Sequence, residues 1–132
     1  MRLERKESGD FSQIDTTCRI IEGCGVDKVR LVRGDRDPVY EGGIPGLKRY
    51  VNVALNSYLP TGYSMNIRGV DERGFQIIPA FRGVDSKFYI LEDLVLSEEG
   101  LLIKTTIEER NLGRAKKNEM LPRDLLALMP EV

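Results

Sequence analysis

The chain has 132 residues, of which 41% are hydrophobic and 31% charged, and its formal net charge at pH 7 is −1. These values are typical of one globular domain and argue against wholesale disorder. The apolar runs are too short to span a membrane, and the charged first residues lack the apolar stretch of a secretory signal. We therefore expect a single domain over residues 1–132, without membrane contact and in the cytoplasm or another intracellular compartment.

The N-terminal third of the chain predicts an arm followed by a hairpin. Residues 1–13 are mostly polar and predict an N-terminal arm. Residues 16–33 predict a β-hairpin, because short apolar runs flank two glycines. In the second half of this hairpin, Lys28 and Arg30 alternate with apolar residues, which indicates a strand with one wet face and one buried face.

The segment 45–59, PGLKRYVNVALNSYL, has two interpretations. As a helix, it gathers its apolar side chains into one wide stripe with only Val53 misplaced, and Pro45 suits a first helical position. As a strand, Val51, Val53 and Leu55 alternate with their neighbours, and valine and tyrosine favour that state. The helix separates the two kinds of side chain better, so we favour the helix.

Residues 62–109 predict an antiparallel meander of four strands joined by short turns. Gly100 suits the left-handed position of a tight turn after Ser97 and two glutamates. Pro79 cannot donate a ladder hydrogen bond, so its strand must lie at an edge or carry a bulge. The third strand is expected to place four apolar residues on one face, namely Phe88, Ile90, Leu94 and Leu96.

The end of the chain predicts a short helix over residues 122–129, which begins at Pro122 and is stopped by Pro130. Its apolar side chains must pack on the domain's own sheet or on a neighbouring subunit. We take residues 120–132 as a tail that can dock on a neighbour. The candidate interface residues are Leu125, Leu126, Leu128 and Met129. All these elements together predict an α+β fold that is mainly β.

The chain has no histidine and only two cysteines, Cys18 and Cys24. A Ser–His or Cys–His nucleophile pair is therefore impossible, and a zinc site would need about four suitable ligands. Adjacent carboxylates such as Glu92 and Asp93 are expected on opposite faces of a strand, where they cannot act together. We predict no catalytic residue, no metal site and no cofactor, and we interpret the cysteines as reduced, partly buried thiols.

Two basic clusters point to another class of function. The first consists of Lys28, Arg30, Arg33 and Arg36, and the second of Arg110, Arg114, Lys116 and Lys117. Basic side chains of this kind can bind the phosphates of nucleic acid. Neither cluster contains the aromatic residues on which bases stack, and the chain as a whole is not basic. We therefore favour the interpretation that each basic cluster belongs to a surface that faces water or another protein.

These observations rank three functions. The favoured hypothesis is a non-enzymatic structural or assembly subunit that acts through protein–protein contacts in a homo- or hetero-oligomer. A component of a viral or other multi-subunit particle fits that description. The alternative is a nucleic-acid-binding or regulatory module that uses the basic clusters 28–36 and 110–117. A small enzyme that depends on carboxylates or on a metal ion is the second alternative.

Overall fold

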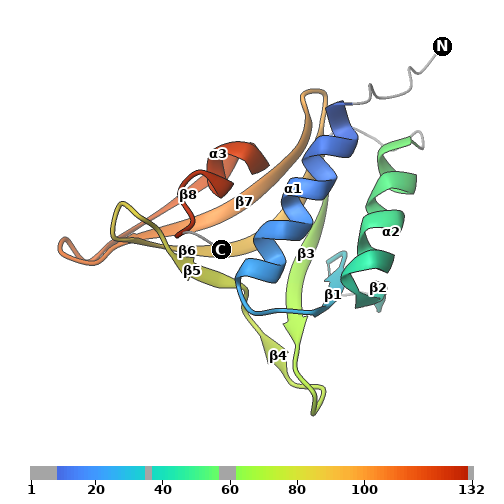
Figure 1. Ribbon diagram of the computed structural model, residues 1–132, viewed down its shortest axis with the longest axis horizontal. Helices are drawn as coiled ribbons and strands as arrows, with labels where there is room; N and C mark the ends of the chain where they lie inside the picture. The colour runs from blue at the N-terminus through green and yellow to red at the C-terminus, as the bar shows by residue number, and fades with distance from the viewer. Residues whose placement is uncertain (1–8, 35–36, 57–61, 131–132) are drawn as a thin grey trace.

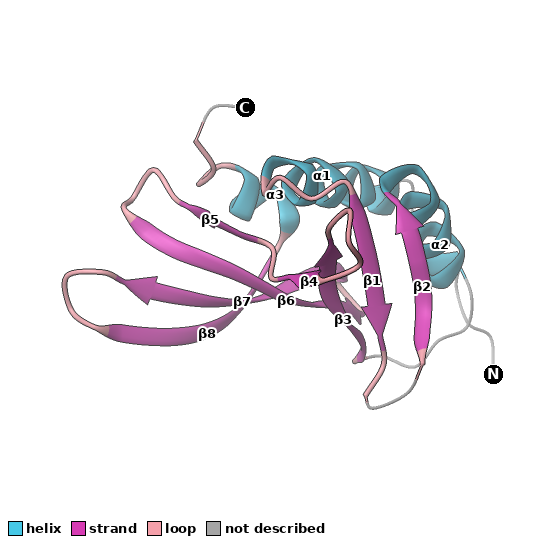
Figure 2. Cartoon of the chain, turned by 90° about the horizontal axis from the view of Figure 1, so that it is seen from below, coloured by secondary structure: helices cyan, strands magenta, loops and turns pink. Residues whose placement is uncertain are grey.

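The computed structural model describes residues 9–34, 37–56 and 62–130. In these residues it contains three helices and eight strands, and the strands pair antiparallel in one sheet. The helices gather on one side of the sheet, and no described helix covers its other side (Figure 1 and Figure 2). The predicted fold class, α+β and mainly β, is confirmed.

The first element is a helix, α1 (Gly9–Gly23). Buried residues recur along it at Ile14, Cys18 and Ile21, a spacing of four and then three residues that brings them to one face. The side chain of Thr17 donates a hydrogen bond of 2.7 Å to the Gln13 carbonyl one turn earlier. The threonines and isoleucines of α1 are β-branched, and such residues favour strands. The segment is nevertheless a helix, because this conformation brings its buried side chains to one face.

This helix corrects two predictions about the N-terminal third. The hairpin over residues 16–33 is wrong, because residues 16–23 belong to α1 and the two glycines end a helix instead of closing a turn. Gly25 takes a positive φ of 81°, as is usual just after a helix. Residues 9–13 of the predicted arm form the first turns of α1, and residues 1–8 lie outside the described residues.

The strand predicted after the glycines exists, but its partners are different. β1 (Lys28–Val32) pairs with β2 (Pro38–Gly43) on one side and with β3 (Tyr63–Val70) on the other. Burial alternates along β1, which confirms the buried face and the wet face expected for it. Arg30 on the wet face lies directly opposite Glu41 of β2.

The ambiguous segment 45–59 is a helix, α2 (Ile44–Asn56), in its described part. Residues 57–59 lie outside the described residues. Within the described residues, Leu47, Val51, Ala54 and Leu55 of the apolar stripe are buried and Tyr50 is half-buried, whereas Val53, which did not fit the stripe, is 67% exposed. The segregation of side chains around the helix therefore identified both its core-facing side and its one misplaced residue.

The long path through the sheet follows the order β2-β1-β3-β6-β7-β8. β6 (Lys87–Ser97) and β7 (Gly100–Glu109) form the hairpin predicted at Gly100, whose φ is 108°. β8 (Arg114–Met120) pairs along β7 at the edge of the sheet. This last strand was not predicted, because six of its seven residues are exposed and no apolar alternation marks it.

The predicted second strand of the meander consists of two short strands, β4 (Gln76–Ile77) and β5 (Ala80–Arg82). β4 pairs with β3 and β5 pairs with β6, so this segment lines the region where β3 and β6 separate. Pro79 lies between the two strands, and its carbonyl accepts a hydrogen bond of 2.9 Å from the Leu91 amide. The edge position expected for the strand around Pro79 is therefore confirmed.

The C-terminal helix α3 (Pro122–Leu126) begins at Pro122 as predicted, but it ends at Leu126 and not at residue 129, and a turn and a bend lead from it to Pro130. Leu125 is 0% exposed and Met129 is 7% exposed, both within the core of this chain. The Val84 amide in the turn between β5 and β6 donates a hydrogen bond of 2.8 Å to the Leu128 carbonyl. The tail is therefore fastened to its own domain.

One side-chain contact joins the first helix to the far end of the sheet. The Gln13 side-chain oxygen accepts a hydrogen bond of 2.7 Å from the Leu101 amide, across 88 positions of sequence. α1 also packs against α2 and α3, so it occupies the middle of the helical layer (Figure 2). Among the described residues, no helix has the length and apolar character needed to cross a bilayer.

Candidate functional site

The face of the sheet away from the helices is lined largely by polar side chains. Residues directly opposite each other on antiparallel strands share a face, so the register of the sheet identifies the outward residues. Positive and negative side chains are mixed across this uncovered face. Its polar residues include Glu41, Arg30, Arg68, Asn66, Asp93, Lys104, Thr106, Lys117 and Glu119.

A β-bulge in β6 brings two carboxylates to this face. Leu91 lies opposite Thr105 and Asp93 lies opposite Lys104, so Glu92 is an extra residue without a partner of its own. Such an extra residue lets two neighbours point to the same side of a sheet. The prediction that Glu92 and Asp93 lie on opposite faces is therefore wrong.

The same bulge reverses the burial pattern within β6. Phe88 and Ile90, before the bulge, are half-buried on the uncovered face, whereas Leu94 and Leu96, after it, are buried under the helices. The prediction that these four side chains share one face is wrong for that reason. Two adjacent polar residues inside an otherwise apolar strand are the sequence signal for the bulge.

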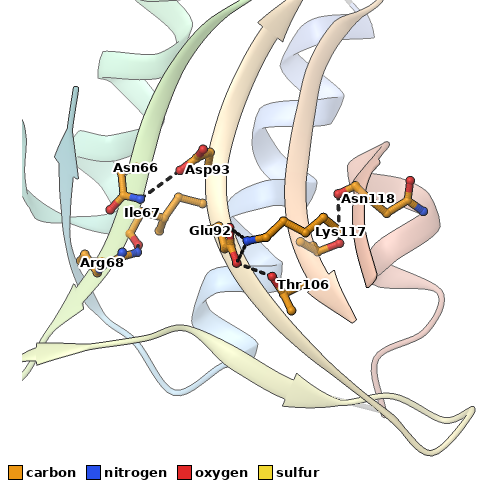
Figure 3. A network of polar contacts seen from close by, with 9 residues as sticks. Asn66, Ile67, Arg68, Glu92, Asp93, Thr106, Lys117 and Asn118 are labelled. Carbon is orange, nitrogen blue, oxygen red and sulfur yellow. Dashed lines mark hydrogen bonds and ion pairs between the residues drawn. The ribbon is translucent and has the colours of Figure 1, made fainter. Parts of the chain in front are cut away.

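The two carboxylates are held by side chains of β3, β7 and β8 (Figure 3). The Glu92 carboxylate accepts hydrogen bonds from Thr106 Oγ1 and from Lys117 Nζ, the latter at 2.9 and 3.0 Å. Asn66 Nδ2 donates a hydrogen bond of 3.0 Å to Asp93 Oδ1. The hydrogen bond from Thr106, followed by the contact with Lys117, lowers the pKa of Glu92. An ionised carboxylate that accepts these hydrogen bonds holds strands of the sheet together and is a weak general base at neutral pH.

A hollow of about 660 Å³ lies beside the turn between β6 and β7. Its lining includes four carboxylate side chains, namely Glu98, Glu99, Glu119 and Asp124. Across residues 9–34, 37–56 and 62–130, however, no three His, Cys, Asp or Glu side chains form a group that could hold a metal ion. The hollow is therefore an acidic surface without the geometry of a cation site.

The two cysteines are free thiols on the helical side of the molecule. Burial is the main reason that the pKa of Cys18 is raised to about 11 and that of Cys24 to about 12. A thiol with so high a pKa carries almost no thiolate at neutral pH and is a poor nucleophile. The interpretation of both as reduced, partly buried thiols agrees with this arrangement.

The first basic cluster is only partly brought together. Lys28 and Arg30 point outward from β1. The guanidinium of Arg33 stacks over the Tyr63 ring, with its central carbon 4.5 Å from the ring centroid. Arg36 lies outside the described residues. Two of the predicted four residues therefore share the uncovered face.

The second basic cluster lies at the far edge of the sheet. Arg110 is in the turn after β7, Arg114 forms an ion pair with Glu109 of the neighbouring strand β7, and Lys117 forms one with Glu92 of β6, across β7. Lys116 points to the side opposite Lys117, because neighbouring strand residues alternate in direction. Four strand positions separate β1 from β8 in the sheet order, so the two clusters do not form one basic surface.

The predicted interface residues of the tail divide into two pairs. Leu125 and Met129 belong to the core of this chain. Of the two predicted alternatives, packing on its own domain or on a neighbouring subunit, the first therefore holds for these residues. Leu126 and Leu128 are half-buried against the same core. Contact with a neighbour stays a prediction for the exposed parts of these two leucines.

A more exposed apolar surface lies on the hairpin of β3 and β4, and sequence reasoning did not single it out. Phe75 is 64% exposed, Ile77 40% and Ile78 57%, and the hairpin projects from the body of the molecule (Figure 1). The Asp71 side chain holds its turn by accepting hydrogen bonds of 2.9 Å from the Arg73 and Phe75 amides. The signal in the sequence was the consecutive apolar pair at residues 77 and 78, which breaks the strand alternation.

Comparisons with models of protein families, with curated proteins and with solved structures find no match to this chain. The function is therefore argued from the molecular surface. Two features of that surface are candidate binding sites: the exposed apolar β3–β4 hairpin and the basic side chains that point outward from β1 and β3.

Proposed function

We propose that this chain is a non-enzymatic assembly subunit that associates with further copies of itself through the β3–β4 hairpin. The observation that carries the proposal is the exposure of Phe75, Ile77 and Ile78 on one projecting turn. Apolar side chains gathered on a projecting surface of a soluble protein usually mark a contact site, because leaving them in water is unfavourable.

The edges of the sheet support this choice of surface. β8 carries Arg114, Lys116, Lys117 and Glu119 along its exposed edge, and β2 begins with a proline. Charges and prolines at an edge strand discourage pairing with another chain. The segment 75–78 has neither, so it is the edge best suited to pairing among these three.

The same segment suits a second copy of the chain. FQII contains no charged residue, so two copies placed face to face meet no like-charge repulsion. A two-fold axis brings identical edge strands together antiparallel, and each copy then contributes the same apolar residues to both sides of the contact. Ile78, next to Pro79, extends this contact beyond the two residues of β4.

Sedimentation velocity of the full chain over a range of concentrations tests the proposal. The expected result is a concentration-dependent dimer or larger species that Phe75→Ser and Ile78→Lys each shift to monomer. Both side chains are exposed, so these variants should keep the wild-type unfolding free energy to within about 0.5 kcal/mol.

The matched control is Leu112→Ser, since Leu112 is 60% exposed in the turn between β7 and β8, at another end of the molecule. It should associate as the wild type does. A wild-type chain that stays monomeric at its highest soluble concentration overturns self-association. Equal weakening by Leu112→Ser and Phe75→Ser would place the contact away from the hairpin.

A further inference from the structure

Two arginines lie side by side on the uncovered face. Arg30 of β1 is the direct cross-strand partner of Arg68 of β3. Side chains in this position start from Cβ atoms roughly 4.5–5.5 Å apart, and like charges placed so are mutually repulsive. Both side chains are half-buried, so water screens the repulsion less than at an open surface.

One of these two arginines, Arg30, forms an ion pair with the carboxylate of Glu41. Arg30 Nη2 donates a hydrogen bond of 2.8 Å to Glu41 Oε1, and this contact is the main cause of the lowered pKa of Glu41. Arg30 Nε is buried and has no hydrogen-bond partner in the described part of the chain. A guanidinium group has five N–H donors, and the Nε–H donor of Arg30 is thus left without an acceptor in the described residues.

Arg68 is held by a backbone group instead of a carboxylate. Its Nη1 donates a hydrogen bond of 2.7 Å to the Ile67 carbonyl, and none of the ion pairs among the described residues includes it. On the same face, the carboxylate of Asp93 in the neighbouring strand β6 accepts a hydrogen bond from Asn66 (Figure 3). Lys28 points to the same face two residues along β1 and adds a third positive charge.

We propose that Arg30 and Arg68 together bind one phosphate group on the uncovered face of the sheet. A phosphate group carries between one and two negative charges near neutral pH, and guanidinium groups bind its acceptor oxygens in pairs. Binding offsets the repulsion between the arginines and gives the Nε–H donor of Arg30 an acceptor. Arg30 must turn part of its guanidinium away from Glu41, while Lys28 strengthens the field around the anion.

The site fits a single phosphate group better than a nucleic-acid strand. A polynucleotide needs a succession of positive charges along its path, usually with aromatic side chains between them. Beyond Arg68 the next outward side chains across the sheet are those around Asp93 and Glu92, both negative. Past them, Lys104 of β7 lies directly opposite Asp93, and Lys117 of β8 is paired with Glu92, so these carboxylates interrupt the path of positive charge.

Isothermal titration calorimetry of the full chain with inorganic phosphate, at fixed ionic strength made up with chloride, tests the site. Wild type should bind one phosphate, and Arg68→Gln should weaken binding about tenfold or more, as expected for loss of a charge-assisted hydrogen bond. Arg68→Lys should recover part of the affinity, because it keeps the charge but loses the paired donors. A phosphomonoester tests whether the phosphate is recognised as part of a small metabolite.

The matched control is Arg49→Gln, which removes one charge from an exposed position of α2 on the helical side. It should leave phosphate binding unchanged. The proposal is overturned if wild type shows no binding to phosphate or phosphomonoester, or if Arg49→Gln and Arg68→Gln weaken it equally. Binding of a short oligonucleotide alone, without binding of either small ligand, would equally overturn it in favour of a nucleic-acid surface. Because the hairpin variants leave both arginines in place, this site can fail or succeed independently of self-association.

Discussion

The face of the sheet under the helices and the face away from them are built from the same strands in two different ways. Under the helices, Leu31, Ile67 and Ile103 are all 0% exposed. Away from the helices, Arg30 and Arg68 from two of those strands lie half-buried and polar. Burial of apolar area stabilises the first face, and hydrogen-bonded charges occupy the second.

The difference depends on backbone register as much as on side-chain type. In β6 the extra residue Glu92 exchanges the two faces within one strand, so Ile90 points away from the helices and Leu94 points towards them. A regular strand with this sequence would have to bury a carboxylate or expose leucines. The bulge avoids both outcomes and places a carboxylate pair where neighbouring strands can hold it.

Deleting one residue of β6 should either exchange or preserve the faces to which its side chains point, depending on which residue is deleted. Deletion of Ile90 leaves Leu91 outward and turns Glu92 towards the helices, which should cost about 3–5 kcal/mol or prevent folding. Deletion of Glu92 instead removes the bulge and leaves every other side chain on its present face. Urea unfolding followed by circular dichroism measures both.

The deletion of Glu92 is the control in this pair, and we expect it to cost only about 1–2 kcal/mol for the lost contacts to Thr106 and Lys117. Equal destabilisation by the two deletions would show that the bulge does not decide which residues face the helices.

On the helical side, two adjacent residues of α3 should differ in how much they contribute to stability. Leu125 is fully buried, so Leu125→Ala should lower the free energy of unfolding by about 3 kcal/mol through lost burial and a cavity. Leu126→Ala, at a half-buried neighbour, should cost roughly 1 kcal/mol. Chemical denaturation gives both values. A larger loss at Leu126 than at Leu125 would contradict the packing of α3 on this core.

The uncovered face should contribute a smaller, pH-dependent share of stability. Because the pKa of Glu92 in the folded chain lies below its usual 4.5, the ionised carboxylate stabilises the fold above that value. This contribution is lost as the pH falls through the lowered pKa. Glu92→Gln should cost about 1 kcal/mol at neutral pH, and its difference from wild type should shrink in acid.

Unfolding free energies measured from about pH 7 down to about pH 3 check this dependence. Glu72→Gln, in the exposed turn between β3 and β4, is the control and should follow the wild-type curve. A constant difference between wild type and Glu92→Gln over the whole pH range would mean that the carboxylate's charge does not contribute.

The sequence predicted the elements whose side-chain period is unbroken. Residues 45–56 segregate cleanly around a helix, and residues 101–107 alternate cleanly along a strand, so pattern alone identified both. Gly100 and Pro122 mark a turn and a helix start whose backbone requirements those residues meet directly. Each of these predictions rests on local geometry.

The failures share a different physical origin. In α1, apolar residues before the glycines at positions 23 and 25 suggested one half of a hairpin, although the spacing of Ile14, Cys18 and Ile21 is helical. In β6, one extra residue changed the period inside a correctly located strand. β8 is a strand because β7 offers it a ladder of hydrogen-bonding groups, which its own polar sequence does not reveal.

The candidate site was predictable only in part, since it depends on which strands become neighbours. Lys28 and Arg30 were identified from their basic character and alternation. Arg68 was not, because only the pairing of β1 with β3 brings it beside Arg30. A cross-strand pair between residues 38 positions apart leaves no periodic signal in the chain.

The hydrogen bond between Gln13 and Leu101 has a consequence for the order in which the molecule can assemble. A helix at the beginning of the chain completes its contacts only after β7 exists, and contacts between distant residues form late because closing a long loop is costly in entropy. On the ribosome, α1 therefore waits for Leu101 while residues 24–101 are made. During that interval the part of its apolar face that packs on β7 in the folded chain lacks that partner.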